Sequence, residues 1–276
     1  MENENIKSLQ DIQQVHGVES KPFFKIVIPC YNVSRSISNC LDSILMQSFD
    51  DYLIVCVDDF STDSTRAVIN NYVEKNPLKV RICSPIVKSK AGGARNYGYS
   101  FSGSSEYVWF VDGDDFLANN FVLEEAHNTI ISNDFPDIVS VGYCSVNEVK
   151  KTITITSANN DDCLTEDKLL RSCAVWGKLI RYTKFIPFEE DLMYYEDVFQ
   201  HILQLDSANT FGSVLSTCYV YNCGVSKGQR RFLQIPDFLK LAIRCYQTYP
   251  FKNKLSKNAL KNKILLSLDK FKRLLA

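Results

Sequence analysis

The alternation of apolar runs with amphipathic segments between residues 23 and 141 constrains the fold of this chain more than any other feature. The apolar runs read as buried strands and lie at 24–29, 52–57, 80–83, 107–111 and 137–141. The segments between them have the apolar spacing of helices and lie at 37–45, 61–72, 91–101 and 120–131. Continuous apolar strands that alternate with helices are typical of an α/β fold, in which helices cover both faces of a mostly parallel sheet.

The sequence beyond residue 141 follows a different pattern. Residues 152–156 alternate in polarity, which predicts an antiparallel or edge strand, and residues 211–221 read as a further strand. The tail over 251–276 is rich in Lys and places Leu, Ile and Phe roughly on one helical face. We predict a flexible N-terminal arm over 1–22, a main α/β domain over 23–226 and a basic C-terminal helical extension over 227–276.

The basic tail has three interpretations. It can pack on the domain with its cations in water, dock on an anionic membrane surface, or bind nucleic acid. The whole chain carries 31 Lys plus Arg against 32 Asp plus Glu, a net charge of −1. This balance argues against nucleic-acid binding by the molecule as a whole, so no nucleic-acid partner is expected.

Cysteine usage and hydropathy bear on the compartment. The 10 cysteines include no CxxC pair, and several lie in the apolar runs, which favours buried free thiols in a reducing compartment. Residues 1–20 lack the apolar core of a signal peptide, and no apolar run reaches the roughly 18 residues that a membrane span needs. We expect a cytoplasmic protein that is soluble or peripheral at the inner face of the membrane.

Polar side chains collect where three of the predicted strands end. Pro29 to Asn32 follow the first strand, Asp58 to Asp63 follow the second, and Asp112 to Asp115 follow the fourth. Ligands of an open parallel sheet bind at the carboxyl ends of its strands. The sequence therefore predicts a ligand site at this edge.

The run Asp112-Gly113-Asp114 suits a divalent cation. Mg²⁺ and Mn²⁺ prefer oxygen ligands, and carboxylates this close repel one another unless a cation or hydrogen bonds compensate. Gly113 lets the backbone turn and approach a ligand. The alternative is a plain acidic turn in which Asp115 caps the next helix.

The acids after the second strand have two interpretations. Asp58 stands at the strand tip, where its carboxylate could accept a hydrogen bond from a base. Asp59 and its neighbours could instead be turn and cap residues, and Ser61 or Thr62 could cap the next helix.

Six motifs in this order resemble those of the inverting glycosyltransferases of family 2, which have a GT-A fold. The motifs are Ile28–Asn32, Val57–Asp63, Gly92–Gly98, Val111–Asp115, Trp176–Leu179 and Tyr195–Val198. The resemblance covers about residues 25–226 and implies a Rossmann-like GT-A domain. One departure is Phe60, where the family usually has Gly, and it bears on the conformation of the base-binding loop.

The resemblance implies a nucleotide-sugar donor, most often a UDP-sugar, bound with Mn²⁺ or Mg²⁺. Asp114 would ligate the metal, Asp112 would contact the ribose or the metal, and the Arg95 guanidinium has a fork that suits phosphate oxygens. Arg95 could otherwise be a surface residue of its helix. The implied donor-binding residues are Pro29, Tyr31, Asn32, Asp58, Asp59, Gly93, Arg95, Asn96, Asp112, Gly113, Trp176 and Lys178.

The resemblance also implies a catalytic acidic pair, Glu196 and Asp197. A sugar hydroxyl is a poor nucleophile, so a carboxylate must accept its proton. We assign this role to Asp197, with Glu196 as helper or second candidate, although both acids could simply favour the start of a helix. Trp176 could stack on a sugar or belong to the core, and the segment 224–231 could close over the donor or be a solvated basic loop.

The predicted activity is therefore metal-dependent transfer of a sugar from a nucleotide-sugar to a hydroxyl of a glycan or lipid-linked saccharide. Two alternatives are kept. A sugar-nucleotide pyrophosphorylase usually has a Gly-rich loop after its first strand, where this chain has Pro29 to Asn32. A non-catalytic nucleotide-sugar-binding scaffold would bind donor without turnover.

Overall fold

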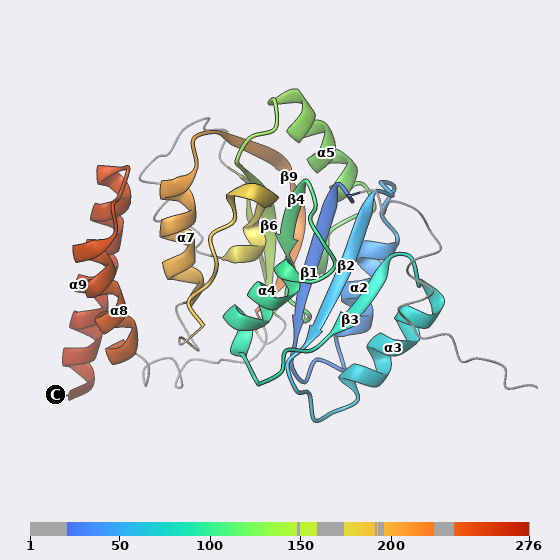
Figure 1. The fold of residues 1–276 in the computed structure, drawn as a ribbon, viewed down its shortest axis with the longest axis horizontal. Helices are drawn as coiled ribbons and strands as arrows, with labels where there is room; N and C mark the ends of the chain where they lie inside the picture. Colours follow the sequence, from blue (N-terminus) through green and yellow to red (C-terminus); the bar gives the residue numbers. More distant parts are fainter. Residues whose placement is uncertain are drawn as a thin grey trace, which may run out of the picture.

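The centre of the fold is one nine-stranded sheet with the order β3-β2-β1-β4-β8-β6-β9-β5, in which β7 also pairs with β6 (Figure 1). The computed structural model describes residues 21–147, 150–158, 174–190, 192, 196–223 and 235–275. The strands are β1 (Phe24–Cys30), β2 (Tyr52–Asp58), β3 (Val80–Cys83), β4 (Tyr107–Phe110), β5 (Phe116–Leu117), β6 (Ile138–Asn147), β7 (Thr152–Thr156), β8 (Lys178–Arg181) and β9 (Phe211–Asn222).

Strand directions agree with the predicted, mostly parallel sheet. Strands β1, β2, β3 and β4 are parallel neighbours, and β6 and β9 run the same way. Strands β5, β7 and β8 run in the opposite direction. Strand β8 lies antiparallel between β4 and β6, and the sequence reading missed it because it is short and carries Lys178 and Arg181 at its ends.

Helices cover both faces of the sheet, as the alternation predicted. They are α2 (Ile37–Leu45), α3 (Thr65–Lys75), α4 (Lys90–Ser100), α5 (Val122–Ser132), α7 (Glu196–Ser207), α8 (Ile235–Thr248) and α9 (Lys254–Leu275). Alternate β1 residues point to opposite faces. Ile26 and Ile28 join an apolar cluster with α2, α3 and α5, whereas Val27 joins another with Ala94 of α4.

Helix α3 begins later than the sequence suggested. Its N-cap is Ser64, not Ser61 or Thr62. The reason is the side chain of Asp63, whose Oδ1 accepts the Thr65 N–H at 3.0 Å and so fixes the first turn at that residue.

The C-terminal helices pack on α7 at the end of the molecule far from α3 (Figure 1). Apolar side chains of α7, α8 and α9 form one cluster, which includes Phe199, Ile202, Ala242 and Leu260. The Asp206 carboxylate of α7 is buried and accepts the backbone N–H groups of residues 252 and 253 at 3.0 and 2.9 Å, just before α9. One face of the basic tail is therefore buried.

Two further findings bear on the predicted compartment. Each of the eight cysteines in the described part is a free thiol. None of the described helices combines the length and the apolar character that a bilayer span requires. The predicted arm over 1–22 falls almost entirely outside the described residues.

Helix α4 approaches the sheet so closely that Gly98 has no space for a side chain. A Cβ there would lie 2.4 Å from Val27 Cγ1 and 2.7 Å from Val57 Cγ2. We expect Gly98→Ala to lower the free energy of unfolding by about 1–2 kcal/mol, since overpacking outweighs the gain in helix propensity. Urea unfolding measures this change. Gly177→Ala is the control, because no atom lies within 4 Å of its Cβ position; equal stabilities of the two variants would contradict the argument.

Candidate functional site

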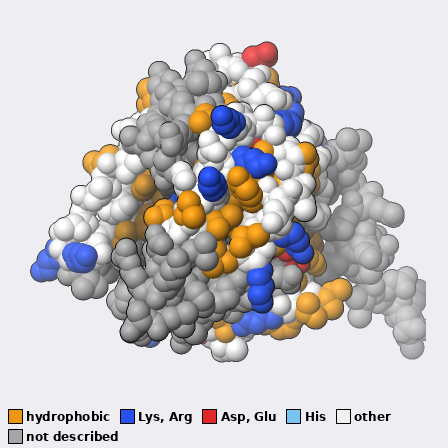
Figure 2. Space-filling model, turned by 90° about the vertical axis from the view of Figure 1, so that its left-hand side faces the viewer, with side chains coloured by type: hydrophobic (Ala, Val, Ile, Leu, Met, Phe, Trp, Pro, Cys, Tyr) orange, Lys and Arg blue, Asp and Glu red, His pale blue; other side chains and the backbone are white. Residues whose placement is uncertain are grey.

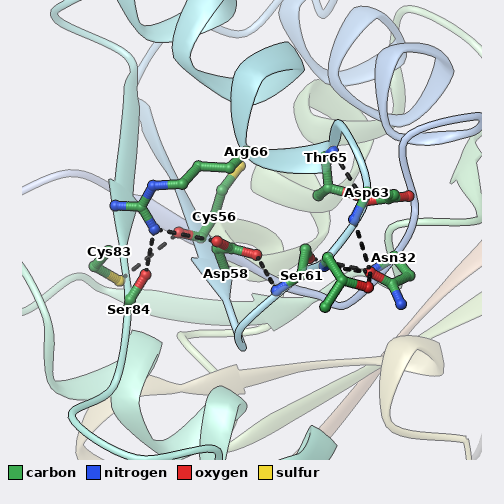
Figure 3. A network of polar contacts seen from close by, with 10 residues as sticks. Asn32, Cys56, Asp58, Ser61, Asp63, Thr65, Arg66, Cys83 and Ser84 are labelled. Carbon is green, nitrogen blue, oxygen red and sulfur yellow. Dashed lines mark hydrogen bonds and ion pairs between the residues drawn. The ribbon is translucent and has the colours of Figure 1, made fainter.

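The tip of β2 is fixed by the buried carboxylate of Asp58 (Figure 3). Its Oδ1 accepts the Ser61 N–H at 3.1 Å, and its Oδ2 pairs with Arg66 Nη1 at 3.1 Å. The same Arg66 nitrogen donates to Ser84 Oγ at 2.8 Å, beyond the end of β3. Asp58 therefore ties two strand ends together at the predicted donor edge, and the sequence reading had missed Arg66.

Asn32 joins the β1 tip to the loop after β2 (Figure 3). Its Oδ1 accepts the Thr62 N–H at 2.8 Å, and its own N–H donates to Ser61 Oγ at 3.1 Å. In the same loop Phe60 has a φ of 62°, the left-handed region that Gly enters freely. The loop thus keeps this conformation with Phe in place of Gly, at a cost of about 1–2 kcal/mol.

Asp59 and Gly93 shape the start of α4. The Asp59 carboxylate accepts the backbone N–H of Ser89 at 2.7 Å and of Lys90 at 2.9 Å, so it caps α4 from another segment. A Cβ on Gly93 would lie 2.7 Å from Ser89 Cβ. Both residues therefore act on the helix backbone, and their contact with a donor stays a prediction.

The ring of Tyr31 is exposed at the carboxyl end of β1. Lys88, in the loop after β3, places its Nζ 3.4 Å from the centre of this ring, a cation–π contact. Pro29 lies one residue before the end of β1, paired with Val57. An aromatic face and a cation thus stand at the predicted nucleotide edge, and the sequence reading had not selected Lys88.

Three carboxylates after β4 form a candidate cation site. Asp112, Asp114 and Asp115 each offer one oxygen, and these oxygens all lie within 4.8 Å of one another. The set consists of oxygen donors only, which fits Mg²⁺ or Mn²⁺. Gly113 has no positive φ, and a Cβ there would lie 3.2 Å from Val33 Cγ2, a tight contact that Val33 would have to relieve by a small shift.

Asp115 anchors the acidic loop to β9 and does not cap the next helix. Its oxygens accept the Tyr219 hydroxyl at 2.7 Å and the Asn222 N–H at 2.8 Å. Burial and the nearby Asp112 raise the pKa of Asp115 to about 8. The Tyr219 ring in turn stacks on Trp176, with ring centres 4.5 Å apart. Trp176 is therefore a buried part of an aromatic core beneath the site.

Arg95 of α4 bridges the acidic loop and α7. Its Nη2 donates to Asp112 Oδ1 at 2.8 Å, and its Nη1 donates to Glu196 Oε1 at 3.2 Å. Burial alone would lower the pKa of this guanidinium, but Asp112 and Glu196 hold it above the usual value. The interpretation of Arg95 as a surface residue is wrong, since only 5% of it is exposed. Its Nε–H is buried without a hydrogen-bond partner.

Asn96 fixes the segment that precedes α7. Its Oδ1 accepts the Phe188 N–H at 2.8 Å, and its Nδ2 donates to the Phe188 carbonyl at 2.9 Å. Phe188 also lies under the Arg95 guanidinium, 5.3 Å from its central carbon. Asn96 therefore positions the wall behind Arg95, while donor contact at Asn96 stays a prediction.

The acidic pair Glu196 and Asp197 occupies the first turn of α7, where the helix dipole favours negative charge. Burial raises the pKa of Glu196, and the pairing with Arg95 opposes this shift. Asp197 is less buried than Glu196, and its Oδ1 accepts the Val198 N–H at 2.8 Å. The two neighbouring acids thus have different environments.

Two predicted features remain, Lys178 and the closing loop. Lys178 is buried, and its Nζ donates to the Ala174 carbonyl at 2.8 Å. The predicted closing loop at 224–231 lies outside the described residues. Among the residues that the sequence analysis did not select for the site, Asp115 and Tyr219 each had one usable signal: Asp115 is a third acid directly after the predicted metal pair, and Tyr219 is a Tyr inside a buried strand.

Removal of the Arg95 guanidinium leaves two carboxylates without their counter-charge. We expect Arg95→Met to lower the free energy of unfolding by about 3 kcal/mol, because one partner of a buried ion pair is lost. Arg95→Lys should lose less, since it keeps the charge but not the fork. Chemical denaturation tests both. Arg35→Met, at an exposed position, is the control. An Arg95→Met variant as stable as the unmutated protein would show that the Arg95 bridge contributes nothing to the free energy of unfolding.

Solved glycosyltransferase structures resemble this fold. The Staphylococcus aureus TarS fragment 1–349 in complex with UDP-GlcNAc aligns with a TM-score of 0.68 and 19% identity, covering 90% of this chain and 73% of that one. The mannosyltransferase PcManGT from Pyrobaculum calidifontis, in complex with GDP-Man and Mn²⁺, aligns with a TM-score of 0.62 and 16% identity, covering 90% and 70%. At these identities the likeness shows the fold alone.

Curated relatives are similar over parts of their length. A poly(ribitol-phosphate) beta-glucosyltransferase from Bacillus spizizenii is 40% identical over 100 residues, which are 36% of this chain and 16% of that protein. The uncharacterized glycosyltransferase EpsJ from Bacillus subtilis is 26% identical over 196 residues, 64% of this chain and 54% of that protein. The chain thus matches about half or less of each of these relatives.

A family model supplies the assignment. The model for glycosyl transferase family 2 matches residues 25–173, which is more than half of the chain and contains β1 to β7 together with the acidic loop. The match, the strand-end site and the GT-A-like neighbours agree with one another. This chain belongs to glycosyl transferase family 2.

Proposed function

We propose that the protein is a metal-dependent inverting glycosyltransferase, which moves a sugar from a UDP-sugar to a hydroxyl of a glycan or lipid-linked saccharide. One observation carries this proposal. The carboxylate cluster at Asp112–Asp115 and the acidic pair on α7 are joined through the single guanidinium of Arg95. A metal-binding group and a basic group held at a fixed relation are what a displacement at a sugar carbon needs.

The donor side of the site follows from the strand tips. Asp58 and Tyr31 would hold the base and ribose, and Asp112 and Asp114 would hold a divalent cation. That cation would neutralise the charge that grows on the leaving diphosphate. The unpartnered Nε–H of Arg95 supplies a further donor for an anion at this place. Two structural neighbours, one in complex with UDP-GlcNAc and the other with GDP-Man and Mn²⁺, support a nucleotide-sugar.

The acceptor side is assigned to Asp197. Glu196 is buried and already pairs with Arg95, so its carboxylate is engaged by a cation. Asp197 is the more exposed acid of the pair and is the better placed to take the proton of a sugar hydroxyl. Glu196 then acts as a positioning residue, because it fixes the first turn of α7 against Arg95.

The acceptor class is inferred from chemistry and relatives together. The name of the Bacillus spizizenii relative refers to a ribitol-phosphate polymer. A glycan of this kind, or a saccharide carried on a lipid, is the acceptor class we propose. A place at the inner face of a membrane belongs to this proposal, and the surface that supports it is described below.

The metal assignment is tested by thermal unfolding with UDP-sugars, with and without Mn²⁺. We expect a UDP-sugar to raise the Tm more when Mn²⁺ is present, and Asp114→Asn to abolish this metal-dependent increment. Asp134→Asn, at an exposed acid two residues beyond the end of α5, serves as the matched control. A metal-dependent increment that survives in Asp114→Asn would remove Asp114 from the site.

The base assignment is tested by release of UDP from the donor in the presence of saccharide acceptors. We expect Asp197→Asn to lower kcat by about 10²–10⁴-fold while donor affinity stays nearly unchanged, because the base acts in the transition state. Glu196→Gln should retain more activity than Asp197→Asn. Full activity of Asp197→Asn would overturn the base assignment, and donor binding without turnover in the unmutated protein would favour a scaffold.

A further inference from the structure

The C-terminal helices concentrate positive charge, and each contains a single acid, Asp237 in α8 and Asp269 in α9. Residues 239–266 contain seven cations, Lys240, Arg244, Lys252, Lys254, Lys257, Lys261 and Lys263, and no Asp or Glu. The rest of the chain therefore carries a net charge of −8, since the total is −1. This positive segment covers most of α8, the turn after it and more than half of α9.

The buried and exposed faces of α9 are distinct. Ser256, Ala259, Leu260 and Ile264 are buried at helical spacing against the rest of the molecule. Leu265 stands on the opposite face at 49% exposure, because nine residues at 3.6 per turn place it across the helix from Ser256. The packing interpretation of the tail is thus right for one face, and a second face is left over.

The second face combines apolar and basic side chains. On α9 it carries Leu265 and the exposed Lys257 and Lys261. Leu266 is also exposed, at 57%, and lies at the far margin of this face, nine residues from Lys257 and therefore across the helix from it. Exposed residues of α8 add Lys240, Ile243 and Arg244. Figure 2 views the molecule from the side on which these helices lie and shows hydrophobic side chains bordered by Lys and Arg, with acidic ones scarce in the coloured part.

We propose that this surface, formed by the exposed residues of α8 and α9 named above, docks on an anionic lipid bilayer. Charge complementarity favours an anionic bilayer as the partner, because each Lys or Arg near its surface contributes about 1 kcal/mol of binding free energy. The exposed leucines would enter the boundary between headgroups and acyl chains. A second copy of this chain that docked through the same surface would place its seven cations against these seven, and the repulsion disfavours such a dimer. Docking on a bilayer would bring lipid-linked acceptors to the enzyme. The inference therefore rests on the proposed function and extends it.

The position of the surface relative to the site supports this purpose. Helix α7 begins with the acidic pair Glu196 and Asp197, which contains the candidate catalytic base, and its apolar face packs on α8 and α9. Asp206 at the far end of α7 also holds the start of α9. Only one helix layer thus separates the candidate base from the docking surface, so a lipid-held saccharide is presented beside α7.

Co-sedimentation of the full chain with vesicles tests the proposal without any donor or acceptor. We expect binding to vesicles of phosphatidylcholine with phosphatidylglycerol, weak binding to pure phosphatidylcholine, and loss at high salt. Lys257→Glu with Lys261→Glu should reduce partitioning at least about tenfold, and Leu265→Ser with Leu266→Ser should also reduce it. Lys75→Glu and Leu78→Ser, exposed in or just after α3 at the other end of the sheet, are the matched controls.

Three outcomes would overturn the proposal. They are failure of the unmutated protein to bind anionic vesicles, equal loss in the α3-side controls, and a dimer in solution that the leucine substitutions dissociate without any vesicle binding. The thermal response to a UDP-sugar with Mn²⁺ is measured on the same variants. An intact response with no vesicle binding defeats the docking surface alone, whereas vesicle binding with no UDP response defeats the proposed function alone.

Discussion

The buried guanidinium of Arg95 is the interaction on which the site depends. It lies where three separate pieces of chain meet: α4, the acidic loop after β4, and the first turn of α7. Glu196 is buried and Asp112 is partly buried, so the cation between them offsets the cost of holding two carboxylates close together, and the Arg fork reaches both. The positions of Asp112 and Glu196 are therefore set together, and a shift of either one disturbs the other.

The placement of Arg95 is itself a matter of backbone contacts. The absence of a side chain at Gly98 lets α4 lie directly on β1 and β2, and Asp59 fixes the N-terminal end of the helix by accepting two N–H groups. At the other end, the buried Lys25 of β1 donates to the carbonyls of Tyr99 and Phe101 at 3.0 and 2.7 Å. Helix α4 is thus held at both ends and along its length, which keeps Arg95 at one height above the sheet.

Much of this arrangement could be predicted from the sequence. Strands β1 to β4 and helices α2 to α5 follow from continuous apolar runs and helical spacing, and their bounds agree within a few residues. The acids at strand ends were found because parallel strands bring their carboxyl ends together. Contacts between distant side chains, such as Asp115 with Tyr219 and Asp58 with Arg66, had no local pattern and were missed. Strand β8 was missed because a run of four residues with a charged residue at each end resembles a loop.

By itself the sequence determined the α/β alternation, the acidic strand ends and the basic tail, because each of these features depends only on the spacing of residues along one segment. The tertiary structure decided which of these residues meet. Arg95 bonds carboxylates 17 and 101 residues away, Trp176 enters the core through Tyr219, and the tail splits into a buried and an exposed face. These outcomes depend on packing between segments, where burial makes an unpaired charge or polar group costly, and the order of residues along one segment does not contain that information.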